Sequence, residues 1–236
     1  MKIPSFFKLL IFFFVSNSHA TTIYEQDFSK ENGEWQSVLT LLNSSAIPDN
    51  PISCWISWLN LYACTVPSSI INGHNEIKSP WWLDENHAPP GAGYLNLLTW
   101  TYPKEPIDIS NAILELEIAT QNLNLKGSKL LFWFQNNAPN GKFANFALTG
   151  TPIDVKSDGI TRRILLDLSS KKDNWTCLGT SLSRADTYDC MPVEESAKKV
   201  DIDFGFIIFP VSSNPDPTLQ PTGIIKIKSI KILTSE

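Results

Sequence analysis

The sequence predicts an all-β chain that folds as an antiparallel two-sheet β-sandwich. Apolar and polar residues alternate along the chain with the period of two that half-buried strands show, and no stretch longer than about two turns repeats apolar residues at helical spacing. Turn-forming sequences rich in Gly, Pro, Asn and Asp separate these stretches. Eight or more strands with polar turns between them are typical of a two-sheet sandwich.

The clearest strand covers residues 111–120. One face carries three apolar side chains and the other carries two carboxylates, and these residues are Leu114, Leu116 and Ile118 against Glu115 and Glu117. A sheet with one apolar and one charged face is typical of antiparallel pairing, because parallel sheets bury both faces. Similar patterns predict strands at residues 23–28, 93–102, 129–135, 142–148, 160–168, 200–209 and 224–233.

Four isoleucines line the last predicted strand, namely Ile225, Ile227, Ile230 and Ile232. The first two share a face, and the second two return to that face only after a slip of one residue. An extra residue in one strand of an antiparallel pair is a β-bulge. The sequence therefore predicts a bulge near Lys228 or Ser229.

The first twenty residues have the layout of a cleaved secretory signal. Lys2 and Lys8 precede an unbroken apolar run over residues 9–15, and the segment ends in Ser18-His19-Ala20. The apolar run is shorter than the roughly 20 residues that cross a bilayer, and no later segment reaches that length. We expect a secreted or periplasmic protein without a membrane span, with a signal peptide at residues 1–20 and a single β-sandwich domain at residues 21–236.

The net charge of the chain is −5, and it falls to −7 without the two lysines of the signal segment. An acidic surface repels the phosphate backbone of nucleic acids, so no nucleic-acid partner is expected.

All four cysteines, Cys54, Cys64, Cys177 and Cys190, lie in the exported part, and an even count in an oxidising compartment favours disulfides over metal ligation. Three pairings are possible. We expect Cys54–Cys64 and Cys177–Cys190, because each closes a short local loop. Each bond would then tie one irregular insertion, at residues 43–80 and 170–199.

Residues 79–100 combine tryptophans, acids, a histidine and rigid turn residues. Proline fixes φ and glycine permits unusual φ, so Pro89-Pro90-Gly91 would hold the side chains of this loop in a defined arrangement. Aromatic rings on a rigid loop stack well on sugars. The residues expected to bind a ligand are Trp81, Trp82, Asp84, Asn86, His87 and Tyr94. The alternative is that the loop plugs the open end of the sandwich, since large aromatic side chains are commonly buried.

The other tryptophans divide into two groups. Trp100 and Trp133 lie in strongly apolar strands and are expected in the core. The sequence leaves the places of Trp35, Trp55, Trp58 and Trp175 open.

The run Asp84-Glu85-Asn86-His87 holds acid, amide and imidazole groups together. Such a cluster could coordinate a metal or supply a general acid and base, whereas the simpler interpretation is a capped turn. A glycosidase or polysaccharide lyase would need two carboxylates, and the candidates are Asp84, Glu85, Glu115, Glu117 and Asp154. The sequence assigns no catalytic residue, and motifs such as Gly-x-Ser-x-Gly are absent from it.

The two ends of the chain resemble the galactose-binding-like jelly-roll modules that serve as carbohydrate-binding modules of secreted proteins. The residues that carry this resemblance are Glu25-Gln26-Asp27-Phe28, Gly33-Glu34-Trp35, Phe204-Gly205-Phe206-Ile207-Ile208 and residues 225–232. The resemblance implies a sandwich of jelly-roll type whose first and last strands pair. It also implies a structural calcium ion near acidic residues of those strands, where Glu25 and Asp27 match, although Lys228 stands where the family often has aspartate.

Three functions remain open at this stage. The first is a non-catalytic protein that binds an extracellular polysaccharide or other glycan through the aromatic loop. The second is a glycan-active enzyme that uses the same loop, and the third is a structural or adhesive surface protein whose loop meets a protein partner.

Overall fold

The computed structural model describes residues 20–30, 33, 35–42, 53–56, 62–66, 69–71, 74–78, 95–101, 105–178, 189–210, 217–219 and 221–235. For residues 36–42, 53–56, 62–66, 69–71, 74–78 and 95–101, and for Pro217 and Ser235, the backbone is described. The expected signal segment lies outside this part of the chain apart from Ala20. Within the described ranges, no helix has both the length and the apolar character needed to cross a membrane.

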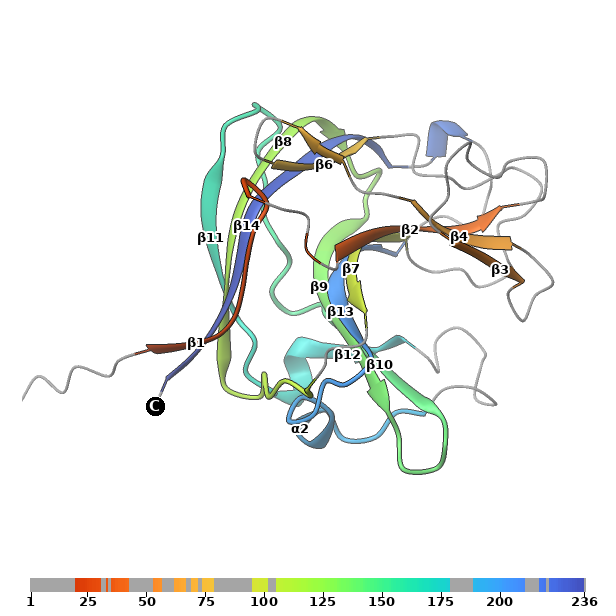
Figure 1. Ribbon diagram of the computed structural model, residues 1–236, viewed down its shortest axis with the longest axis vertical. Helices are drawn as coiled ribbons and strands as arrows, with labels where there is room; N and C mark the ends of the chain where they lie inside the picture. The colour runs from red at the N-terminus through yellow and green to blue at the C-terminus, as the bar shows by residue number, and fades with distance from the viewer. Residues whose placement is uncertain are drawn as a thin grey trace, which may run out of the picture.

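Two antiparallel sheets make up the fold, which confirms the predicted β-sandwich (Figure 1). The six-stranded sheet contains β1 (Ala20–Asp27), β5 (Ser69–Ile71), β6 (His74–Lys78), β8 (Ala112–Asn124), β11 (Arg162–Asp167) and β14 (Thr222–Ser235). The eight-stranded sheet contains β2 (Trp35–Leu42), β3 (Ser53–Ile56), β4 (Tyr62–Val66), β7 (Leu95–Thr101), β9 (Lys129–Asn137), β10 (Phe143–Leu148), β12 (Trp175–Cys177) and β13 (Asp203–Phe209). Short helical turns are η2 (Lys172–Asn174), α2 (Val193–Ser196) and η3 (Pro217–Leu219).

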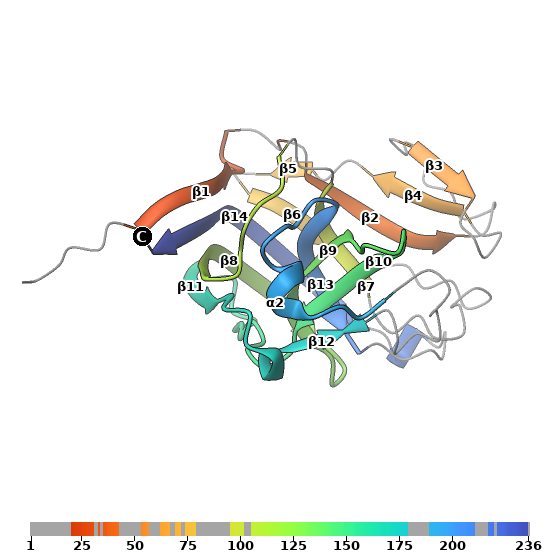
Figure 2. The same ribbon diagram turned by 90° about the horizontal axis from the view of Figure 1, so that it is seen from below.

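The chain passes repeatedly between the sheets, as it does in a jelly roll. The eight-stranded sheet has the order β12-β10-β9-β13-β7-β2-β4-β3, and the six-stranded sheet has the order β11-β8-β14-β6-β5 with β1 also on β14. Figure 2 shows β2, β4 and β3 reaching away from the side of the molecule where β1 and the end of β14 lie.

Strand β14 lies in the middle of the six-stranded sheet. It pairs with β8 along one edge, and along the other it pairs with β6 and then with β1, in the register Glu25 to Lys231 and Asp27 to Ser229. The first and last strands therefore pair, as the family resemblance implies, and Figure 1 shows them side by side near the end of the chain.

The predicted bulge in β14 is confirmed. The register with β8 shifts between Ile227 and Ser229, so that Lys228 is the extra residue. On both sides of the bulge the isoleucines face the core, and Ile225, Ile227, Ile230 and Ile232 are each no more than 1% exposed.

The main core lies between the two sheets. β8 supplies Leu114, Leu116 and Ile118, which confirms the predicted alternation of that strand, and β9 supplies Leu130, Phe132 and Phe134. Trp35 is 1% exposed and lies among aromatic rings, with ring centroids 5.4 Å from Phe204 and 6.1 Å from Phe206. Its indole Nε1 donates a hydrogen bond of 2.5 Å to the Tyr24 hydroxyl, which satisfies the buried donor.

Helix α2 lies at one end of the sandwich (Figure 1). The backbone amide of Ile109 donates to the Ala197 carbonyl at 2.8 Å, and the side-chain amide of the buried Asn136 donates to the Ser196 carbonyl at 3.1 Å. These bonds join the helix to β9 and to the segment before β8, so α2 covers that end of the core.

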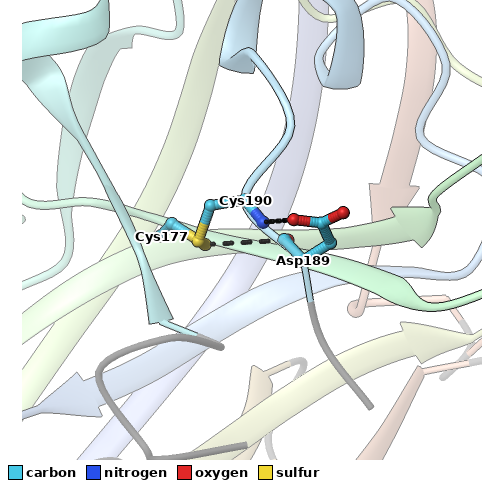
Figure 3. The surroundings of a disulfide bond; sticks show 3 residues. All are labelled: Cys177, Asp189 and Cys190. Atoms are coloured by element: carbon cyan, nitrogen blue, oxygen red, sulfur yellow. Dashed lines mark hydrogen bonds between the residues drawn. A yellow bond between two sulfur atoms is a disulfide. The ribbon is translucent and has the colours of Figure 1, made fainter. Parts of the chain in front are cut away.

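The predicted disulfide between Cys177 and Cys190 is confirmed, with Cα atoms 5.8 Å apart (Figure 3). The backbone amide of Asp189 also donates to the Phe143 carbonyl at 2.9 Å. This hydrogen bond holds the residues next to Cys190 against the start of β10. Cys54 and Cys64 are register partners on β3 and β4, and Cα atoms of antiparallel partners lie within the range that a disulfide spans. The second bond stays a prediction.

The expectation that residues 43–80 are irregular is wrong, because β3, β4, β5 and β6 fall in this segment. These strands are three to five residues long, too short for an alternating pattern to stand out. Strands β2 and β12 were also not predicted. All eight strands predicted from alternation are present.

Candidate functional site

The eight-stranded sheet has a second face, which points away from the six-stranded sheet and which we call the outer face. Successive side chains of a strand point to opposite sides, so β9 sends Phe132 and Phe134 into the main core and Trp133 and Gln135 to the outer face. The outer face is therefore composed of residues that the sandwich core does not use.

Three polar residues lie side by side on this face. Gln135 of β9 is the register partner of Asn145 on β10 and of Asp203 on β13. We call Asn145, Gln135 and Asp203 the polar row. On its other side, Asp203 has Thr101 of β7 as its backbone register partner. Gln135 and Asp203 are half-buried, and Asn145 is buried.

An aromatic residue lies on the same face, two positions along β9 from the polar row. Trp133 has Ala147 of β10 and Gly205 of β13 as register partners, so small residues flank its ring. It is 2% exposed and belongs to a small apolar cluster with Leu131, Ile207, Ala147 and Leu178. Burial of Trp133 was predicted, but its cluster lies outside the main core.

At the edge of the sheet, β12 adds a pair of hydroxyl groups to this face. Thr176 is the register partner of Ala147, and its Oγ1 lies 2.7 Å from Oγ1 of Thr149. These hydroxyl groups lie beside Ala147, next to the Trp133 cluster.

The residues predicted to bind a ligand, Trp81, Trp82, Asp84, Asn86, His87 and Tyr94, all lie outside the described residues. Their segment, residues 79–94, connects β6 to β7 in the chain. β7 enters the eight-stranded sheet at Leu95, whose register partner is Ile208 of β13. The chain thus leads from the predicted loop directly into the strand next to the one that carries Asp203.

Sequence reasoning missed the polar row. Gln135 and Asp203 were expected within strands, but their alignment depends on the register between strands that are far apart in sequence. A partial signal was present, because Gln135 and Asp203 are polar ends of otherwise apolar strands.

Two tryptophans that the sequence left open are part of the main core. Trp35 packs as described above, and Trp175 is 7% exposed with its ring centroid 5.1 Å from that of Phe134. Neither is therefore available to a ligand. Trp58 lies outside the described residues, and for Trp55 and Trp100 the backbone alone is described.

Glu115 and Glu117 lie on the solvent side of the six-stranded sheet, where each carboxylate has a basic partner. Arg163 contacts Glu115 at 2.6 Å, and Lys228 contacts Glu117 at 2.9 Å. The hydrogen bond from Lys228 lowers the pKa of Glu117 below its usual value. A general acid needs a raised pKa, so Glu117 does not suit that role. Asp154 is exposed, and Asp84 and Glu85 lie outside the described residues.

The two acids matched to a calcium site each contact a lysine instead. Glu25 lies 2.9 Å from Lys231, and Asp27 lies 3.4 Å from Lys30 and accepts the Ser29 amide at 2.9 Å. The hydrogen bonds with Ser29 lower the pKa of Asp27. Calcium takes six to eight oxygen ligands, whereas no three metal-binding side chains gather anywhere in the described part of the chain. These two residues as placed do not fit a calcium site.

No protein-family model and no curated protein matches this chain. Among solved structures, a xylan-binding module, CBM15, matches over 92% of this chain and 99% of its own, with 11% sequence identity and a TM-score of 0.34. At so low a TM-score the function has to be argued from the residues themselves.

Proposed function

We propose that this protein binds an extracellular glycan without changing it chemically, and that the outer face of the eight-stranded sheet forms part of the binding surface. The observation that carries the proposal is the polar row beside Trp133. The main core makes no use of these side chains, yet three amide and carboxylate groups stand at one level on neighbouring strands.

The chemistry of the row suits a sugar. An amide both donates and accepts hydrogen bonds, and a carboxylate accepts two, so Gln135 and Asp203 match the paired hydroxyl groups of a pyranose. A few polar groups set into an otherwise apolar surface are the usual means of orienting a small ligand. The half-buried Gln135 and Asp203 would contact the sugar, and the buried Asn145 would hold the Gln135 side chain in position.

The predicted loop would complete the surface. Trp81 and Trp82 would supply a ring for stacking, with Asp84, Asn86, His87 and Tyr94 around them. The loop runs into β7 at Leu95, whose register partner is Ile208 of β13. Its end would therefore lie beside the apolar end of the outer face, and its side chains would have to extend from there toward the polar row. Stacking and a few hydrogen bonds must offset the cost of ordering a flexible ligand, so we expect millimolar to micromolar affinity, about −4 to −8 kcal/mol.

Binding rather than catalysis is favoured by the state of the two catalytic candidates that lie on β8. Glu115 and Glu117 are held by Arg163 and Lys228, and such ion pairs on a solvated sheet face are ordinary surface chemistry. An extracellular site of action agrees with the Cys177–Cys190 disulfide, since such bonds persist in oxidising compartments.

Titration calorimetry of the oxidised protein against neutral polysaccharides tests the proposal. We expect Gln135→Ala and Asp203→Ala to weaken binding at least about tenfold, or about 1.4 kcal/mol. Gln121→Ala is the matched control, because Gln121 is an exposed glutamine on β8 of the other sheet. Trp81→Ala and Trp82→Ala test the loop separately. Unchanged affinity in all four folded variants would refute the proposal.

A further inference from the structure

We propose that two copies of this protein pair edge to edge through β11, so that their six-stranded sheets join into one continuous antiparallel sheet. The interface belongs to the six-stranded sheet, whereas the proposed function concerns the outer face of the other sheet. The inference therefore stands independently of glycan binding.

Strand β11 is an edge strand with open backbone groups. It pairs with β8 along one side, no described strand pairs with its other side, and Figure 1 shows it at the margin of the sheet. The backbone amide of Leu168, just after β11, donates to the Ala112 carbonyl at 2.9 Å. In an antiparallel pair every second residue directs its backbone groups to the same neighbour. Arg163, Leu165 and Asp167 therefore direct their amides and carbonyls away from β8, as the residues of an unpaired sheet edge do.

The side chains of these three residues are exposed as well. Leu165 is 57% exposed, and Arg163 and Asp167 lie on either side of it on the same face. Ile113 of β8, the register partner of Asp167, adds a second apolar side chain that is 43% exposed. The edge thus presents an apolar position between a basic and an acidic one.

This order of residues is complementary to itself. When two antiparallel copies of β11 are aligned on Leu165, that residue lies opposite Leu165 of the second copy, and Arg163 lies opposite Asp167 in both directions. Each of these pairs can exchange two backbone hydrogen bonds, about six in all, with Cα atoms about 5.5 Å apart. A shift of two residues either way would place Leu165 opposite a charged side chain, so this register is favoured over its neighbours.

The charges also favour a second copy over an unrelated strand. Charged side chains on an edge strand normally hinder pairing, but here each meets its opposite in the second copy. Arg163 already contacts Glu115 at 2.6 Å, and its guanidinium has further N–H donors for a second carboxylate. The Asp167 carboxylate accepts the Ser169 amide at 2.8 Å and the Ser169 hydroxyl at 3.0 Å, and each of its oxygens keeps a second lone pair.

Sedimentation equilibrium of the oxidised protein tests the proposal. One strand pair is a small interface, so we expect a reversible dimer with a dissociation constant between about 1 µM and 1 mM. The average mass should rise from that of one chain toward that of two chains and no further. A single chain at every concentration up to about 1 mM would overturn the inference.

Two charge variants test the register. Asp167→Arg and Arg163→Asp should each weaken the dimer at least about tenfold, because like charges then lie opposite each other. An equimolar mixture of the two variants should recover the affinity, since the change in one chain complements the change in the other. Asp173→Arg and Lys172→Asp on η2 make the same changes of charge away from β11 and are the controls. Unchanged association in the β11 variants, or no gain on mixing folded variants, would overturn the assignment to this edge.

A proline variant tests the backbone contact separately. Leu165→Pro removes an amide that points away from β8, so the ladder with β8 is kept while the dimer should be lost. Leu165→Ala keeps the amide and is the matched control, whose dimer should weaken less. Far-UV circular dichroism checks that both variants fold. Equal association of the folded proline and alanine variants would show that the backbone edge is not the interface.

Discussion

Lys228, the extra residue of the bulge in β14, reaches back across the sheet to Glu117 of β8, with Nζ and Oε2 2.9 Å apart. The same lysine accepts the Phe28 amide at its backbone carbonyl, at 2.9 Å. The irregularity that keeps the isoleucines of β14 facing the core is therefore also where β14, β8 and the end of β1 meet.

Deletion of Lys228 should strongly destabilise the protein. Without the extra residue, a one-residue change of register turns Ile230 and Ile232 away from the core. Each buried isoleucine contributes roughly 1.5–3 kcal/mol, so the expected loss is about 3–6 kcal/mol in urea unfolding. Lys228→Ala keeps the bulge, so its free energy of unfolding should fall far less than that of the deletion. Equal losses in the two variants would mean that the bulge itself is not needed.

Acid should weaken the fold partly through Glu117. Its pKa is lowered in the folded state, so its contribution is complete above the usual value of 4.5 and is lost as the pH falls through the folded value. As the pH falls below 4.5, the unfolding free energy of Glu117→Gln should therefore fall less than that of the parent. Lys228→Met should flatten the same region in part, because it removes the hydrogen-bond donor. If the unfolding free energies of the parent, Glu117→Gln and Lys228→Met fall in parallel with pH, this explanation is wrong.

Loss of the Cys177–Cys190 bond should cost roughly 3 kcal/mol, the value expected for closing a short loop. The measurement is urea unfolding of the Cys177→Ser, Cys190→Ser double variant under oxidising conditions. Cys54→Ser, Cys64→Ser is the companion variant, and thiol counting in the denatured parent should find no free thiol if both bonds form. One reactive pair per chain would show that Cys54 and Cys64 remain reduced.

The aromatic cluster around Trp35 should carry much of the stability. Phe204 is 1% exposed and contacts both Trp35 and Tyr24, so Phe204→Ala should cost about 3–5 kcal/mol. Leu165→Ala, on a side chain that is 57% exposed, should stay within about 0.5 kcal/mol of the parent. A small effect at Phe204 would show that the two sheets do not pack as described.

Calcium should leave the melting temperature unchanged if Glu25 and Asp27 keep their lysine partners. The measurement is a thermal melt with millimolar calcium and again with a chelator, on the parent and on Lys231→Met. A rise in Tm with calcium that disappears in Glu25→Gln would instead show that the ion displaces Lys231 and that the family resemblance extends to the metal.

Local pattern was enough to predict most of the fold. The alternation in β8 and the slip among the isoleucines of β14 each follow from one strand's need to keep apolar side chains on one face, and both are confirmed. The short strands β3 to β6 escaped prediction because a few residues hold too little alternation to distinguish a strand from a loop.

Of the candidate site, the sequence predicted the loop but not the polar row. Residues 79–94 stand out in sequence because unusual residue types are close together in the chain, and their role stays a prediction. The polar row could not be found this way, since Asn145, Gln135 and Asp203 are ordinary polar residues in three separate strands.

By itself, the sequence determined which residues of the alternating strands must be buried and where β14 bulges, because these depend on the spacing of neighbouring residues. It favoured the Cys177–Cys190 bond among three possible pairings, and the structure decided between them. Only the tertiary structure decided that Trp35 enters the main core, that Trp133 belongs to a separate cluster on the outer face, and that Gln135 lies between Asn145 and Asp203. Those relations depend on strand order and register, which are set by how two whole sheets bury their apolar faces together.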